Sequence, residues 1–241
     1  MYHMLLTTIM TVFTLSIQTP EEPGIHERTL TLSDGSEMRY TLSIPEREDA
    51  TKPVPLILAL HYGWGGQGPP EPFYGKGILT RLIEPALGHL GAVIVAPDCP
   101  AKGWTDPKSD RLVMALLDHI MEQFPINTKE VLVTGYSLGG AGTWHMAAHH
   151  PDRFSAAIPV AGWPASEHEA LLEAMPLYVI HSRQDEVVPI GPGEAMVEKL
   201  RAGGKQVEFL VVEGLTHHQT PLFAPYLKQT VPWIKEIWGR N

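Results

Sequence analysis

Short apolar runs recur along the chain and alternate with longer segments whose apolar residues are spaced as in a helix. Leu56–Leu60 and Ala92–Ala96 contain no polar residue. Such runs are typical of strands that are buried on both faces of a parallel sheet. Comparable runs predict further strands at 131–134, 154–160, 177–180 and 206–212.

The segments between these runs have helical patterns. Residues 109–124 repeat apolar side chains at helical intervals, and Ser109 is a suitable N-cap. Other helices are expected after residue 137 and at 79–90, 166–174, 194–202 and 230–238. Ahead of the first apolar run, 27–32 and 38–44 alternate around Ser33-Asp34-Gly35, a sequence that predicts an antiparallel hairpin.

The repeated order of strand, loop and helix predicts an α/β fold with a mainly parallel central sheet, helices on both faces and the N-terminal antiparallel hairpin. The length of 241 residues suits one large domain, which we place at 27–241 after an N-terminal segment at 1–26. Ligands of such sheets bind beyond the carboxyl ends of the strands, so residues that directly follow strands carry the most information.

The N-terminal segment has two interpretations. Met4–Ile17 is mostly apolar, as in a signal peptide, yet no Lys or Arg precedes Arg28 and threonines interrupt the run. The alternative is an added strand. The first interpretation favours an extracellular or periplasmic protein over a cytoplasmic one. The segment is too short and too polar for a transmembrane helix, so we expect no stable membrane insertion.

Charge and cysteine content exclude several kinds of partner and site. The formal net charge of −9 disfavours nucleic acid and anionic membranes. Cys99 is the single cysteine, which rules out an internal disulfide and a zinc site whose four ligands are cysteines. His145, His149 and His150 lie on or directly after an expected helix. A metal site is one interpretation, but this spacing alone is weak support for it and favours a surface role, so no metal is expected.

Gly135-Tyr136-Ser137-Leu138-Gly139 lies between a strand and a helix. This is the pattern of a nucleophile elbow, in which a serine occupies a strained turn and flanking glycines allow close backbone approach. A glycine-rich turn with an incidental serine is the alternative. A nucleophilic serine also needs a base, and the base needs a carboxylate that orients it.

Both partners occur in loops after later strands. Asp185 follows the strand at 177–180, and His217 follows the strand at 206–212, so the chain order is Ser, Asp, His. We therefore expect Ser137, Asp185 and His217 to form a catalytic triad. The neighbours His218 and Glu186 are alternatives for the base and the acid.

From about residue 50 to 240, the chain resembles compact α/β-hydrolases such as dienelactone hydrolases, phospholipase/carboxylesterase-like enzymes and esterase-type depolymerases. The resemblance rests on five motifs in order: His61-Tyr62-Gly63-Trp64-Gly65-Gly66, Gly135 to Gly140, Ala148 to Phe154, Asp185-x-x-Val188-Pro189 and Gly214-x-x-His217. The last motif favours His217 over His218. The first departs from the usual His-Gly-x pattern.

The resemblance implies a cofactor-free serine carboxylesterase that forms an acyl-enzyme. It also implies an oxyanion hole made by the amide of Leu138 and one from the loop at 61–66. Analogy with the family pattern indicates Trp64, whereas counting from His61 indicates Gly63. Trp104 and Trp163 also follow strands and are expected to bind substrate.

The short stretch between residues 160 and 177 leaves no room for a lid domain, which favours an open cleft for small esters or esters on a polymer. The alternatives are a peptidase or thioesterase on the same fold and a non-catalytic binding module.

Overall fold

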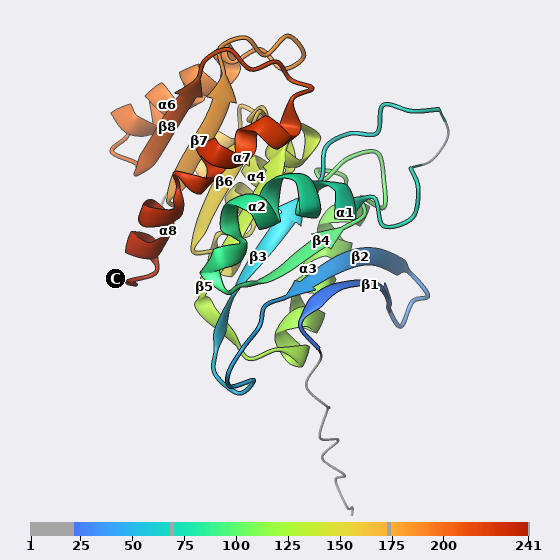
Figure 1. The fold of residues 1–241 in the computed structure, drawn as a ribbon. Coiled ribbons are helices and arrows are strands. Elements are labelled where there is room, and N and C mark those ends of the chain that lie inside the picture. The colour runs from blue at the N-terminus through green and yellow to red at the C-terminus, as the bar shows by residue number, and fades with distance from the viewer. Residues whose placement is uncertain (1–21, 68–69, 173–174, 241) are drawn as a thin grey trace, which may run out of the picture.

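A computed structural model describes residues 22–67, 70–172 and 175–240. Within them, eight strands form one sheet in the order β1-β2-β4-β3-β5-β6-β7-β8 (Figure 1). The strands are β1 Gly24–Thr31, β2 Glu37–Ile44, β3 Val54–Leu60, β4 Val93–Pro97, β5 Ile126–Tyr136, β6 Ala156–Val160, β7 Leu177–Ser182 and β8 Val207–Val212. The predicted signal peptide or added strand at Met4–Ile17 lies outside the described residues.

The sheet is mixed at one edge and parallel elsewhere. β1 pairs with β2 and β2 with β4 in antiparallel fashion, while β4, β3, β5, β6, β7 and β8 are parallel neighbours. The apolar runs of β3 and β4 explain this placement, because both strands are buried on two faces. The predicted fold class is confirmed.

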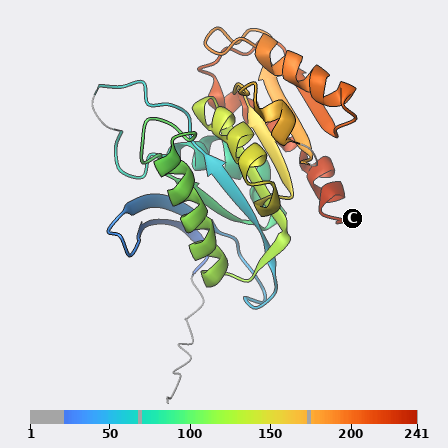
Figure 2. The same ribbon diagram turned by 180° about the vertical axis from the view of Figure 1, so that it is seen from behind.

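Helical segments cover both faces of the sheet. Seen from behind, α3, α4 and α6 lie on one face, where Leu112, Trp144 and Leu200 join a common core (Figure 2). α2, α7 and α8 lie on the other face, with Leu87, Leu227 and Ile234 in a second core (Figure 1). The segments are α1 Gly75–Ile78, the π-helical η1 Leu79–Ile83, α2 Glu84–Leu87, η2 Gly88–Leu90, α3 Pro107–Gln123, α4 Leu138–His149, η3 Pro151–Arg153, α5 His168–Leu171, α6 Gly191–Ala202, η4 Thr220–Phe223, α7 Ala224–Lys228 and α8 Val231–Ile237.

Some boundaries differ from the sequence predictions for local reasons. The helical segment expected at 79–90 begins at Gly75 and contains a π turn just before Pro85, which has no N–H for a regular helical bond. Asp106, not Ser109, caps α3, since its Oδ1 accepts the Lys108 N–H at 2.9 Å. Residues 24–26, predicted to lie in the N-terminal segment, belong to β1.

The parallel strands determine where a site can form. Their carboxyl ends share one edge of the sheet, so the residues that follow β3, β5, β6, β7 and β8 converge there. Among the described residues, no helix has the length and apolar character needed to cross a membrane.

Candidate active site

Ser137 lies on a strained turn between β5 and α4. Its backbone has φ 58° and ψ −115°, a conformation that non-glycine residues rarely adopt. A side chain at Gly139 would overlap the carbonyl oxygen of Leu60, so α4 begins directly against the end of β3. The Ser137 N–H donates to the Val160 carbonyl at 3.0 Å, which fixes the turn to β6.

The structure brings the three predicted triad residues together. His217 Nε2 lies 2.7 Å from Ser137 Oγ, and His217 Nδ1 lies 2.7 Å from Asp185 Oδ2. Asp185 comes from the loop after β7 and His217 from the loop after β8. The arrangement lets the imidazole accept the serine proton at one nitrogen while the carboxylate holds the other.

Asp185 is held as a carboxylate inside the protein. Its Oδ1 accepts the N–H groups of Val187 at 3.1 Å and Val188 at 2.7 Å. Burial alone would raise its pKa, but hydrogen bonds from His181, His217 and Val188 outweigh this and lower the pKa below its usual value. A fixed negative charge beside Nδ1 of His217 follows.

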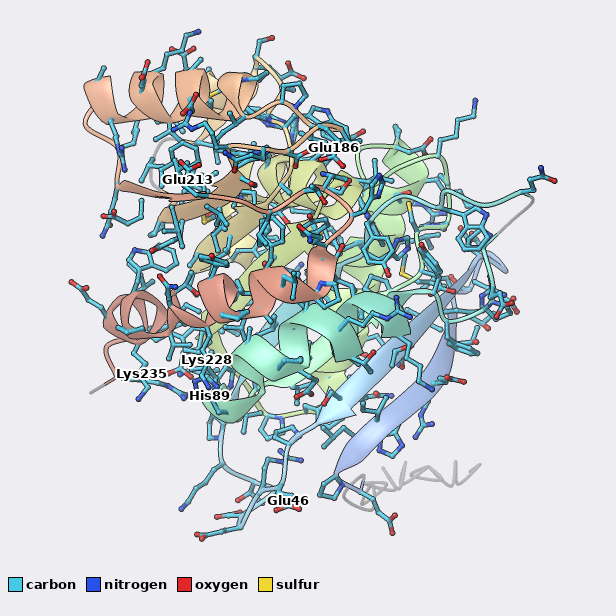
Figure 3. All side chains as sticks on the ribbon, turned by 45° about the horizontal axis from the view of Figure 1, so that its top comes forward. Glu46, His89, Glu186, Glu213, Lys228 and Lys235 are labelled. Carbon is cyan, nitrogen blue, oxygen red and sulfur yellow. The ribbon has the colours of Figure 1, made fainter. Side chains whose placement is uncertain are left out.

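Neither alternative partner occupies a triad position. Glu186 accepts the backbone N–H of His217 at 2.9 Å, so it contacts the main chain of the base rather than its ring. Figure 3 shows Glu186 at the upper rim of the molecule, on the loop after β7. His218 is exposed, and its ring centroid lies 5.8 Å from that of His217.

Two cavities meet at Ser137, and Gly63 borders both. The first, of about 690 Å³, is apolar, and its wall includes Leu138, Trp163, Pro164, Val188 and Pro192. The second, of about 490 Å³, is aromatic and polar, and its wall includes Tyr62, Trp64, Tyr74, Arg81, His217 and His218.

The three tryptophans expected near the site have different environments. Trp163 is 42% exposed and lines the apolar cavity. Trp64 is 40% exposed and lines the aromatic cavity, with its ring centroid 5.2 Å from that of Tyr74. Trp104 is fully buried, so the prediction that it contacts substrate is wrong. Its indole N–H instead donates to the His61 carbonyl at 2.9 Å.

His61 anchors the loop that faces the elbow. The Cys99 N–H donates to His61 Nε2 at 2.9 Å, so the ring proton resides on Nδ1 and is donated to the Tyr62 carbonyl at 2.6 Å. Burial lowers the pKa of His61 to about 4, which keeps the ring neutral. The loop passes beside the elbow, since a Cβ added at Gly63 would lie 3.8 Å from the Leu138 side chain.

The structure also brings together three histidines, a grouping that the sequence did not predict. His145 and His149 on α4 lie beside His168 at the start of α5, and a ligand atom of each lies within 4.8 Å of the others. Burial lowers the pKa of His168 to about 4. Sequence spacing indicated only the pair on α4, because the packing of α5 brings in the third ring.

Several known proteins of similar sequence are esterases. The profile of the Dienelactone hydrolase family matches residues 101–220. A probable feruloyl esterase C of Aspergillus flavus is 27% identical over 194 residues, covering 77% of this chain and 69% of the relative. An uncharacterized secreted protein of Arthroderma benhamiae is 24% identical over 243 residues, covering 82% of this chain and 25% of the relative.

The fold comparison agrees with the sequence comparison. The crystal structure of a thermostable esterase superposes with a TM-score of 0.76 at 23% identity, covering 88% of this chain and 62% of that one. Both comparisons, together with the sheet order and the elbow, lead to one classification. The chain has the α/β-hydrolase fold and is a carboxylesterase-type hydrolase, similar in sequence to the dienelactone hydrolase family and to feruloyl esterases.

Proposed function

We propose that this protein hydrolyses carboxylic esters through an acyl-enzyme formed on Ser137. The observation that carries the proposal is the continuous hydrogen-bonded chain from Ser137 Oγ through His217 to Asp185. His217 takes the serine proton as Oγ attacks the acyl carbon, then returns it to the leaving alcohol. Water repeats these steps to release the acid, and Asp185 stabilises the imidazolium each time.

The developing oxyanion needs donors on the side of Ser137 opposite to His217. The amide of Leu138 is suitable, because it is the first residue of α4 and the helix N-terminus favours negative charge. For the second donor we propose the amide of Gly63 in place of that of Trp64. Gly63 borders Ser137 in both cavities, whereas Trp64 borders only one.

The two cavities accept the two halves of the ester. His217 must reach the oxygen of the leaving alcohol, and it lines the aromatic cavity but not the apolar one. The alcohol therefore occupies the aromatic cavity, and the acyl group occupies the apolar cavity beside Trp163. An aromatic acyl group such as feruloyl suits this wall, and the name of the Aspergillus flavus relative supports that substrate class.

A substrate panel tests the proposal directly. Methyl ferulate, p-nitrophenyl acetate, p-nitrophenyl palmitate, an acyl thioester and a peptide amide are compared with purified full chain. We expect turnover of the first two, a large loss with palmitate, and little or no amide cleavage. A folded protein that turns over none of these substrates would be a binding module, and a preference for the thioester would replace the esterase assignment.

The variant Ser137→Ala provides the matched control. Its turnover should fall by about three or more orders of magnitude, since the nucleophile is removed while binding remains. Its melting temperature should stay close to that of the wild type, because the hydroxyl contributes little besides the bond to His217. Retained activity in this variant would show that another residue is the nucleophile.

We also propose that the enzyme acts outside the cytoplasm. The apolar stretch Met4–Ile17 and the secreted relative of Arthroderma benhamiae support this location. Expression of the full chain in an exporting host, followed by N-terminal mass analysis of the medium, tests it. Recovery of uncleaved protein from the cytosol alone would contradict export.

A further inference from the structure

We propose that His145, His149 and His168 form a binding site for a divalent transition metal, with Zn²⁺ the best match. A ligand atom of each lies within 4.8 Å of the others. His145 lies eight residues after Ser137 on α4, which places it about 12 Å along the helix from the nucleophile. The site is therefore separate from the triad.

The ring arrangement is close to that of a three-histidine site. His145 and His149 lie one turn apart with ring centroids 4.2 Å apart, and His168 lies 6.3 and 5.8 Å from them. Zinc binds imidazole nitrogen at about 2.0 Å, so tetrahedral coordination places ligand nitrogens about 3.3 Å apart. The ligand atoms now lie within 4.8 Å of one another, so coordination requires side-chain rotations that bring them closer. Water would complete the tetrahedron.

Existing hydrogen bonds already orient two of the rings. His145 Nε2 lies 3.1 Å from Asp110 Oδ1, which leaves Nδ1 for a metal. His149 Nδ1 lies 3.0 Å from the His145 carbonyl, which leaves Nε2. A carboxylate or carbonyl on the far nitrogen is the usual support of a metal-binding histidine, since it fixes the tautomer and makes the ligand more basic.

His168 has a competing contact that limits the affinity. The Ala165 N–H donates to His168 Nδ1 at 3.2 Å, and a neutral imidazole offers only one nitrogen lone pair. Metal binding must replace this long hydrogen bond. His168 is only 2% exposed, whereas His149 is exposed and gives the ion an entry path.

The site would connect two elements that matter for the substrate. α5 has four residues and follows Trp163 and Pro164, which line the apolar cavity. α4 begins at the elbow. An ion shared by α4 and α5 would fix this cavity wall to the helix that carries the nucleophile, in a structural rather than a chemical role.

Calorimetric titration of EDTA-treated full chain with ZnCl₂ tests the proposal without any activity measurement. We expect one ion per chain, with affinity at least tenfold weaker in His149→Ala and in His168→Ala. Asp110→Asn should weaken binding by about tenfold, as expected when the support of a ligand is lost. His89→Ala is the matched control. His89 is an exposed histidine in η2, an element that contributes no residue to the cluster.

A thermal melt provides the second measurement. Zn²⁺ should raise the melting temperature of the wild type and of His89→Ala, but not that of His149→Ala, because an ion that binds only the folded state stabilises it. His149 is exposed, so this variant keeps the fold even if His168→Ala does not. Absence of wild-type binding, or unchanged binding in His149→Ala, would overturn the proposal. Neither result depends on whether the protein is an esterase.

Discussion

Asp185 and Glu186 are adjacent carboxylates with different tasks. Asp185 Oδ2 contacts the ring of His217 and is buried, whereas Glu186 contacts only the backbone N–H of His217. The contributions of the two carboxylates to turnover can therefore be distinguished by replacing each with its amide. This change preserves the shape of the side chain and one acceptor oxygen.

Asp185→Asn should lower kcat by about four orders of magnitude. The new amide would donate to His217 Nδ1, so the ring would carry its proton on Nε2 and could no longer accept one from Ser137. Glu186→Gln should stay within about tenfold of the wild type, because its carbonyl oxygen still accepts the His217 N–H. Steady-state kinetics on methyl ferulate measures both. An equal loss in the two variants would contradict the assignment of the acid.

At the scale of single residues, the sequence predicted which side chains come together better than it predicted what surrounds each of them. The chain order of Ser137, Asp185 and His217 was readable, because each follows a strand of a parallel sheet and those ends must converge. The burial of Trp104 was not, since following a strand does not reveal whether a side chain points into a cleft or under a loop. The sequence also left the second amide of the oxyanion hole open between Gly63 and Trp64, because following a strand does not reveal which amide of a loop faces the serine.

Between elements, the contact of α4 with the end of β6 is a tight constraint. A Cβ at Gly140 would overlap the Val160 carbonyl and the backbone of Gly162. Neither neighbour is a flexible side-chain end, so the helix would have to move away from the sheet. That movement would also shift Ser137 and Leu138.

Gly140→Ala should lower the free energy of unfolding by about 1–3 kcal/mol, as expected for overpacking at a rigid contact. Gly191→Ala is the control, because Gly191 begins α6 with open space around its Cβ position. The control should be neutral or more stable by up to about 1 kcal/mol, since alanine favours helix. Urea unfolding measures both. Equal stability of the two variants would show that α4 can shift freely.

The elements themselves were largely predictable, while their fine structure was not. Apolar runs located the strands, and the hairpin around Asp34 was evident from its turn residues. The π turn before Pro85 and the cap at Asp106 depend on local hydrogen bonding that periodicity does not report. The cluster that includes His168 depends on how α5 packs on α4, which is tertiary information.

Across the whole molecule, buried ionisable groups determine how the fold responds to acid. His61 is neutral and buried, with one ring nitrogen accepting the Cys99 N–H. Its pKa is lowered from 6.5 to about 4 by burial, so below pH 6.5 the unfolded chain binds a proton that the folded protein does not. The lowered pKa of Asp185 affects stability at lower pH. The stabilisation from this carboxylate is lost only as the pH falls below the ordinary pKa of an aspartate.

Stability should therefore decrease as the pH falls from about 6.5 to 4, with His61 contributing about 3 kcal/mol at about 1.4 kcal/mol per pH unit. Burial also lowers the pKa values of His145 and His168, which act in the same direction. Urea unfolding of EDTA-treated protein at pH 7, 5.5 and 4.5 measures the trend. His61→Asn, which cannot take up a proton, should be less stable at pH 7 but lose less on acidification. A wild type equally stable at pH 7 and 4.5 would contradict the prediction, since it would show that the folded protein accommodates protonated His61.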